Sequence, residues 1–219
     1  MLSRLTRIAA PIAVALVVCA TIAAQQTALT DAQIKSAEVE VPRLLELLEL
    51  KPGMTVADVG AGFGAWTMRL ARAIGPSGRV YATDLGAAQL AALRDATARE
   101  RLNNVTIIEG AVSSTNLPAL CCDAILIRDA YHHFTQPDAL IKSLAASLKP
   151  GGRLAVIDFP PRPSTDVPAG VPANRGGHGV PSAVVEREVR GELTHVRTIP
   201  AWSPASEPAS LFLVLFRKP

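Results

Sequence analysis

Residues 56–64, VADVGAGFG, constrain the fold of this chain more than any other stretch. The first four residues are mostly apolar, which is typical of a strand buried on both faces of a sheet. Three glycines follow, and they allow the backbone to turn sharply and to approach a ligand closely. An apolar repeat with helical spacing then begins at Ala65. A strand, a glycine turn and a helix N-terminus in this order predict a nucleotide site at the carboxyl edge of a parallel sheet.

Asp58 bears on which class of cofactor this turn can hold. The spacing Gly60-x-Gly62-x-x-Ala65 also fits the loose dinucleotide fingerprint. A dinucleotide would place its pyrophosphate at the turn, and a carboxylate two residues before the first glycine would repel that group. A cofactor with a cationic amino acid end and no phosphate, such as S-adenosylmethionine, tolerates the charge. The simpler alternative is a structural turn in which Asp58 only caps backbone donors.

The remaining chain alternates strand-like apolar runs with amphipathic helical segments. Strands are predicted at residues 79–83, 105–109, 123–128 and 153–158. Helices are predicted to begin near Pro42, at Ala65, at Ala87 and at Pro137, whereas residues 25–35 are interpreted as a polar linker. This alternation predicts a doubly wound α/β sheet. Asp84 ends the second strand about 20 residues after the glycine turn, where a carboxylate can accept ribose hydroxyls, or can instead cap the next helix.

Four motifs in order give the chain a family resemblance: VADVGAGFG, VYATD, DAILIRDAYHHF and LKPGGRLAVID. Together they resemble the class I S-adenosylmethionine-dependent methyltransferases, from about residue 41 to residue 158. The resemblance implies a Rossmann-like, seven-stranded sheet that is mostly parallel, with an antiparallel last hairpin. Residues 194–199 and 211–216 would supply this hairpin, and the methyltransferase domain would occupy residues 36–219.

The resemblance also implies which residues bind S-adenosylmethionine. The glycine turn would wrap the methionine half, Asp58 would lie near the amino group, and Asp84 would hold the ribose. Arg128 and Asp129 would line the pocket near the sulfonium. Many relatives have Gly-Asp after the third strand where this chain has Gly-Ala, so either Ser113 or backbone groups would replace that contact, or cofactor affinity would be weaker. The predicted cofactor-binding residues are Asp58, Gly60, Ala61, Gly62, Phe63, Gly64, Asp84, Leu85, Ala111, Arg128 and Asp129.

Histidines follow the fourth predicted strand, where a methyl acceptor is expected to approach. Residues 131–134, YHHF, and residues 177–179, GHG, resemble paired segments of small bacterial methyltransferases. An imidazole can remove the proton of a hydroxyl or amine acceptor as the methyl group moves. The predicted catalytic residues are therefore His133, His132 and His178, although His133 can equally be a buried packing residue. Residues 160–181 are expected either to form a lid over the acceptor or to be a disordered insertion.

These features predict a methyltransferase that acts on a small-molecule acceptor. The alternatives are a non-catalytic ligand-binding module on the same fold and, less favoured because of Asp58, a nicotinamide-dependent oxidoreductase. The formal charge is only +3 and no basic cluster occurs, so nucleic acid is not an expected partner. Cys121 and Cys122 are adjacent and are interpreted as small apolar side chains, and no metal site is predicted.

The N-terminal residues predict an export signal or a membrane anchor. Arg4 and Arg7 precede an apolar run over residues 8–24, which ends in small residues. Cleavage near residue 24 or retention as an anchor would both place the domain outside the cytoplasm, in the periplasm or secreted. A misassigned start is the third possibility. Any membrane contact is expected only through this segment, and the oligomeric state is not predicted.

Overall fold

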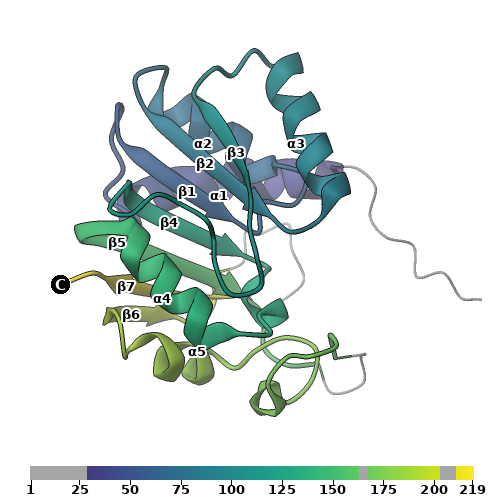
Figure 1. The fold of residues 1–219 in the computed structure, drawn as a ribbon, viewed down its shortest axis with the longest axis vertical. Helices are drawn as coiled ribbons and strands as arrows, with labels where there is room; N and C mark the ends of the chain where they lie inside the picture. Colours follow the sequence, from purple (N-terminus) through teal and green to yellow (C-terminus); the bar gives the residue numbers. More distant parts are fainter. Residues whose placement is uncertain (1–28, 163–166, 203–210) are drawn as a thin grey trace, which may run out of the picture.

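A seven-stranded sheet in the order β3-β2-β1-β4-β5-β7-β6 forms the centre of the molecule (Figure 1). The computed structural model describes residues 29–162, 167–202 and 211–219. Strands β1 to β5 run parallel, and β7 is antiparallel to β5 and β6. The predicted doubly wound sheet with an antiparallel last hairpin is thereby confirmed. The strands are β1 (Thr55–Val59), β2 (Arg79–Asp84), β3 (Val105–Glu109), β4 (Cys122–Arg128), β5 (Leu148–Asp158), β6 (Thr194–Ile199) and β7 (Phe212–Arg217).

Helices cover both faces of the sheet. The buried side chains of α1 (Asp31–Leu47) and α2 (Ala65–Ile74) pack on one face, and α3 (Ala87–Arg99) packs on β2 beside them. The opposite face, toward the viewer in Figure 1, is covered by α4 (Pro137–Ser147) and α5 (Ser182–Val189). Among the described residues, no helix combines the length and apolarity needed to span a bilayer.

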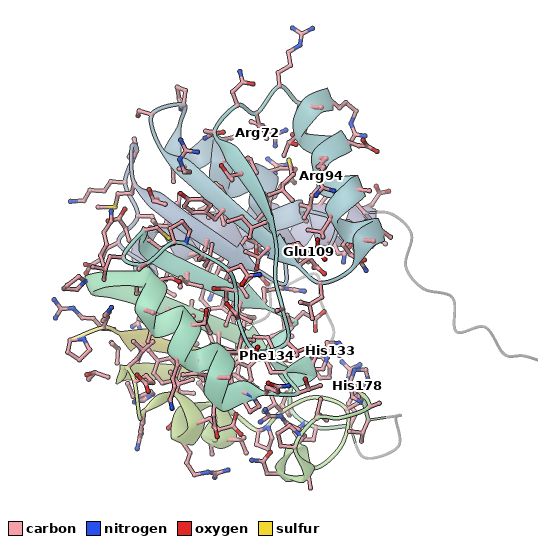
Figure 2. The ribbon with its side chains drawn as sticks, viewed as in Figure 1. Arg72, Arg94, Glu109, His133, Phe134 and His178 are labelled. Atoms are coloured by element: carbon pink, nitrogen blue, oxygen red, sulfur yellow. The ribbon has the colours of Figure 1, made fainter. Side chains whose placement is uncertain are left out.

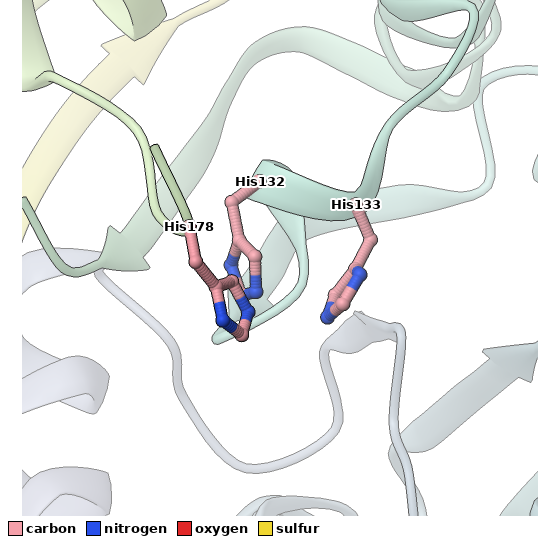
Figure 3. A group of neighbouring side chains, drawn as sticks. All are labelled: His132, His133 and His178. Carbon is pink, nitrogen blue, oxygen red and sulfur yellow. The ribbon is translucent and has the colours of Figure 1, made fainter. Parts of the chain in front are cut away.

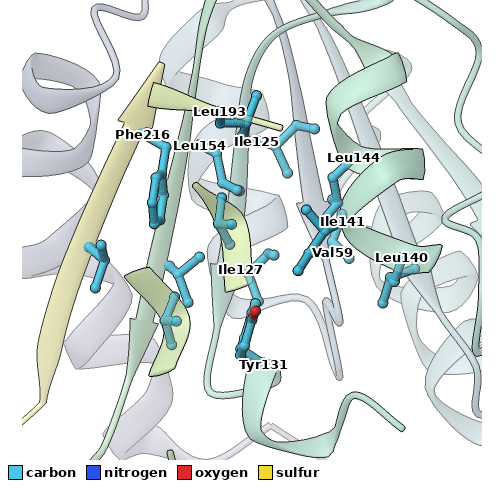
Figure 4. Packing of buried hydrophobic residues seen from close by; sticks show 14 of the residues in the cluster. Val59, Ile125, Ile127, Tyr131, Leu140, Ile141, Leu144, Leu154, Leu193 and Phe216 are labelled. Carbon is cyan, nitrogen blue, oxygen red and sulfur yellow. The ribbon is translucent and has the colours of Figure 1, made fainter. Parts of the chain in front are cut away.

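The central strands are continuous apolar runs, because both faces of each of these strands are buried. On β4, Ile125 and Ile127 point toward α4, where they pack with Leu144 (Figure 4). The alternate residues, Ala124 and Leu126, belong to the cluster on the α1 and α2 side. This two-sided burial is the arrangement that a parallel sheet covered by helices requires.

The N-terminal boundary of the domain differs from the sequence prediction. Helix α1 begins at Asp31, so the linker interpretation of residues 25–35 is wrong from Asp31 onward. Thr30 caps the helix, its side chain accepting a hydrogen bond from the Gln33 N–H while the Gln33 side chain accepts one from the Thr30 N–H. Pro42 was expected in a first turn but lies inside α1. Residues 1–28, with the predicted export segment, lie outside the described residues.

The strand order places a ligand site between β1 and β4. Connections leave β1 toward β2 on one side and reach β4 on the other, so the winding of the sheet reverses there. Ligands of doubly wound folds bind at such a reversal, beyond the carboxyl ends of the strands. The register brings Val59 beside both Thr83 and Ile127 at this edge.

Candidate cofactor and acceptor site

One cavity of about 500 Å³ lies at the carboxyl ends of β1, β2 and β4. This volume is within the range of small-molecule sites. All eleven residues predicted from the sequence to bind the cofactor line it, and of the predicted catalytic histidines only His133 does so. Residues that the sequence analysis did not single out also line it, among them Leu29, Gln33, Trp66, Gln89 and Thr115.

The glycine turn between β1 and α2 forms the floor of the cavity. Gly60, Gly62 and Gly64 have φ angles of +73°, +54° and +89°, a region that L side chains rarely adopt. The N–H groups of Gly60 and Ala61 both donate to the Thr83 carbonyl, at 2.9 and 3.0 Å. A Cβ at Gly60 would lie 2.5 Å from the Cβ of Ala130, whereas a Cβ at Gly62 would meet no atom within 4 Å. Residue 60 must therefore be glycine because a side chain would collide with Ala130. At residue 62 a side chain would instead project into open space next to the cavity.

Asp84 joins the end of β2 to the glycine turn. Its Oδ2 accepts a hydrogen bond from the Gly62 N–H at 2.8 Å, and its Oδ1 accepts from the N–H groups of Leu85 and Gly86 at 2.8 and 3.1 Å. The side chain is thus held in one orientation beside the cavity. A carboxylate has about four acceptor positions, so at least one remains for a ligand hydroxyl. The N-cap of α3 is Gly86 and no side chain caps the helix, so the interpretation of Asp84 as the helix cap is not supported.

Replacing Asp84 with alanine is expected to weaken S-adenosylmethionine binding by about 10- to 150-fold. The basis is the loss of at least one hydrogen bond to a charged acceptor, which contributes about 1.5–3 kcal/mol. Calorimetric titration measures the effect, and circular dichroism checks the fold. Glu109→Ala is the matched control, because Glu109 pairs with Asp84 in the sheet but is exposed and does not line the cavity. An Asp84→Ala dissociation constant equal to that of the wild type would refute the ribose contact.

Asp58 is a buried carboxylate at the cofactor end of the cavity. Its side chain is 3% exposed, and the Thr67 hydroxyl donates a hydrogen bond to Oδ2 at 2.6 Å. Burial raises the pKa of Asp58 from 3.8 to about 6; the Thr67 hydrogen bond opposes this rise and the nearby Asp84 carboxylate adds to it. The folded state therefore binds the Asp58 proton more tightly than the unfolded state, and this contribution to stability is lost as pH rises from 3.8 through about 6.

A bound cation beside Asp58 is expected to make cofactor affinity pH-dependent. The amino group of S-adenosylmethionine favours the ionised carboxylate, so affinity should increase between pH 5 and pH 7 as Asp58 loses its proton near pH 6. Asp58→Asn keeps the shape of the side chain and should remove this increase. Titrations of both proteins at the two pH values test the prediction, and an equal pH dependence in the variant would contradict it.

Arg128 and Asp129 end β4 at the same cavity. The Arg128 guanidinium stacks over the Trp66 ring at 4.1 Å and lies 3.4 Å from Glu40 Oε1 and 3.8 Å from Asp129 Oδ2. Glu40 is fully buried and also accepts a hydrogen bond from the Trp66 indole at 2.9 Å. The cation is thus compensated by Glu40 from α1 and by Asp129 in the cavity lining. Asp129 has a φ of +57°, a strained conformation typical of functional sites.

Helix α1 contributes to the site, which the sequence analysis missed. Glu40 supports Arg128 from α1, and Leu29 and Gln33 line the cavity. The signal was present, since Thr30 and Gln33 have the spacing of a capping box. At the third strand, Ser113 does not line the cavity, so its predicted contact with the adenine is not supported. Gly110, Ala111 and Val112 line it instead.

The three predicted catalytic histidines come together beside the cavity (Figure 3). His132 and His133 lie in the short 3-10 helix η1 (Tyr131–His133), and His178 comes from the loop after β5. The ring centroid of His132 lies 4.0 Å from that of His133 and 5.0 Å from that of His178. His133 is exposed and lines the cavity, so the interpretation of it as a buried packing residue is wrong. Partial burial and the neighbouring histidines lower the pKa of His133 to about 4.

The loop after β5 is anchored beside the site and does not close over it. Arg175 lies within the expected lid, but it is 1% exposed and pairs with Glu188 of α5 at 2.9 Å. The Tyr131 hydroxyl donates to the same carboxylate at 2.8 Å. None of the described residues of this loop lines the cavity, although His178 lies beside His133 (Figure 2). The expected lid is therefore not seen in the described part of residues 160–181.

Most of the residues that line this cavity lie in a segment that is similar to a known protein family. Residues 56–152 match the family described as "Methyltransferase domain". This segment is therefore similar to a methyltransferase domain. Two solved structures of the same fold, 16% and 15% identical to this chain, are described as complexes with S-adenosyl-L-methionine and S-adenosyl-L-homocysteine.

Individual relatives resemble the chain over different lengths. The ubiquinone/menaquinone biosynthesis C-methyltransferase UbiE of Pseudomonas paraeruginosa is 32% identical over 116 residues, 52% of this chain and 45% of the relative. The chain thus spans about half the length of that protein. Two solved structures show the same fold. A SAM-dependent methyltransferase from Aquifex aeolicus has a TM-score of 0.62 at 23% identity, covering 87% of this chain and all of that one. The [4+2]-cyclase SpnF has a TM-score of 0.68 at 17% identity, covering 84% and 82%.

Proposed function

We propose that the protein transfers the methyl group of S-adenosylmethionine to a small-molecule acceptor. The observation that carries the proposal is that one cavity is lined both by the glycine turn with Asp84 and by His133 with Phe134. A cofactor held by the first group would extend toward the second, where the acceptor would bind. The domain match supports the reaction class, and the acceptor is inferred from the size and position of the cavity.

For this reaction the protein has to align the acceptor with the methyl group and to remove one proton from the acceptor. The sulfonium is already activated, so the site has to place the acceptor in line with the methyl carbon and to exclude water. A hydroxyl or amine acceptor must also lose a proton as the new bond forms. The lowered pKa keeps the His133 imidazole neutral at pH 7 with a free lone pair, and it also makes this imidazole a weaker base than an ordinary histidine.

Two other functions are alternatives to methyl transfer. A non-methylating role on this fold is favoured by one observation, the likeness to a structure described as a [4+2]-cyclase. Such a protein would hold a ligand without consuming S-adenosylmethionine. A nicotinamide-dependent oxidoreductase is opposed by the buried Asp58 carboxylate at the turn, because a pyrophosphate would be repelled there.

The reaction is tested by incubating the purified full chain with S-adenosylmethionine and a panel of small hydroxyl, amine, thiol and phenolic compounds. Quinols belong in the panel because the similar Pseudomonas enzyme is named for ubiquinone and menaquinone biosynthesis. The proposal expects S-adenosylhomocysteine to form together with one methylated compound. Tight cofactor binding with no product from any compound would favour the non-methylating alternative.

We also propose export of the chain, which rests on residues 1–24 alone. If the segment is a cleaved signal, the native protein should begin near Gln25 and be found outside the cytoplasmic membrane. An uncleaved anchor would instead leave the full chain in the membrane fraction. Intact-mass spectrometry of fractionated cells separates these outcomes. A protein with Met1 intact in the soluble cytoplasmic fraction would contradict the proposal.

A further inference from the structure

We propose that His132, His133 and His178 form a binding site for a divalent transition metal ion, with Zn²⁺ as the preferred occupant. Their ligand nitrogens all lie within 4.8 Å of one another, and Figure 3 shows the three rings facing a common space. Imidazole nitrogens suit Zn²⁺, and three protein ligands with one open position are typical of catalytic zinc sites. No metal site was predicted from the sequence, because the segments that carry these histidines, residues 131–134 and 177–179, are far apart in the chain.

Asp158 prepares His132 for this role. The carboxylate is fully buried at the end of β5 and accepts a hydrogen bond from His132 Nδ1 at 2.9 Å and from the His132 backbone N–H at 3.0 Å. A carboxylate on Nδ1 keeps the proton there and leaves the Nε2 lone pair for a metal. Carboxylate–histidine pairs of this kind orient the ligands of many zinc sites.

The backbone fixes His178 opposite His132. The carbonyl of His178 accepts from the Arg162 N–H at 2.8 Å, and the Val180 N–H donates to the Phe159 carbonyl at 3.0 Å. Gly179 between these bonds has a φ of +118°, and a Cβ there would lie 2.8 Å from the Pro160 carbonyl oxygen. Glycine is therefore required for the loop to approach the end of β5 closely enough to bring the imidazole to the cluster.

Metal binding requires only a small contraction of the cluster. Nitrogens bound tetrahedrally at about 2.0 Å lie about 3.3 Å apart, so the rings must approach one another by about 1.5 Å at most. His132 is buried and fixed, whereas the exposed His133 and the half-buried His178 can rotate toward it. Asp129 adds negative charge beside the site, because one of its oxygens lies within 4.8 Å of the ligand atoms of His132 and Asp158.

The open metal position would face the acceptor end of the cavity, which His133 lines. This consequence rests on the proposed methyl transfer. A metal-bound acceptor hydroxyl or thiol would release its proton to water, and its lone pair would form the bond to the methyl carbon. The carbon–sulfur bond would break with its electron pair going to sulfur. Metal binding itself does not depend on this reaction.

Cobalt titration of the purified full chain tests the site directly, without a histidine tag and after removal of metals by a chelator. We expect one Co²⁺ per chain with the intense visible absorption of a four-coordinate ion, displaced by one Zn²⁺. His178→Ala and His133→Ala should each weaken binding by at least 10-fold, and Asp158→Asn by about 10- to 100-fold. His195→Ala is the control, because His195 lies on β6 away from the cluster and should leave binding unchanged.

Two results would overturn the site: no Co²⁺ absorption up to millimolar concentration, or absorption that His178→Ala and His133→Ala leave unchanged. Circular dichroism of each variant separates loss of a ligand from loss of the fold. S-adenosylmethionine titration of the metal-free chain runs in parallel. Cofactor binding without metal binding would reject the metal site and keep the proposed function, whereas metal binding without cofactor binding would do the reverse.

Discussion

Gly62→Val is expected to abolish S-adenosylmethionine binding, with a loss of at least about 100-fold in affinity, and to leave the fold intact. Gly62 lines the cavity at the glycine turn, and a Cβ there would meet no protein atom within 4 Å. The added side chain would therefore occupy space needed by the cofactor and would not collide with the core. The positive φ at residue 62 adds a strain of about 1–2 kcal/mol, which a domain of this size tolerates.

Gly53→Val is the matched control for this strain. Gly53 also has a positive φ, +88°, and its nearest neighbour to an added Cβ is the Ser77 hydroxyl at 3.6 Å. It lies before β1 and does not line the cavity. Calorimetry should find wild-type affinity for the control and no binding for Gly62→Val. Comparable affinity in both variants would show that the cofactor does not lie against the glycine turn.

His133→Ala is expected to lower turnover by about 10²- to 10⁴-fold on the acceptor that the panel identifies, the usual effect of losing a general base. His133 is the one of the three clustered histidines that lines the cavity, and the proposed function assigns it to the acceptor rather than to the cofactor. The dissociation constant of S-adenosylmethionine should therefore change little. Both roles considered for His133, proton acceptor and metal ligand, predict this separation of turnover from cofactor affinity.

His195→Ala again serves as the control and should keep wild-type turnover. Product formation and cofactor titration, measured on the same preparations, test the prediction. If His133→Ala retains wild-type turnover on the true acceptor, alignment alone would account for catalysis, as suits an acceptor that arrives already deprotonated. A loss confined to cofactor affinity would instead place His133 against the cofactor.

The fold and the cofactor end of the site were predictable from local sequence. Residues 56–64 carry the strand, the turn and the helix start within one continuous stretch, and the two-sided burial of β4 is visible as an unbroken apolar run. Asp84 was placed correctly because a strand end fixes its position at the edge of the sheet. Each of these features depends on residues that are neighbours in the chain.

The acceptor end was predicted less completely because it depends on contacts between distant segments. Arg175 lies in the segment expected to form a lid, yet its charge is neutralised by Glu188 on α5, a partner that only the folded loop reveals. The pairing of His132 with Asp158 and the approach of His178 likewise come from separate elements. Helix α1 is a different case, since the capping residues that mark its start were present in the sequence.

Titration of the purified wild-type chain with S-adenosylmethionine, S-adenosylhomocysteine and NAD⁺ tests the central claim most directly. The claim is that the cavity beyond β1 and β4 holds S-adenosylmethionine. We expect S-adenosylmethionine and S-adenosylhomocysteine to bind with one site per chain and to compete with each other, and NAD⁺ to cause no heat and no displacement. Binding of NAD⁺ at that site, or the absence of binding by both S-adenosyl compounds, would contradict it.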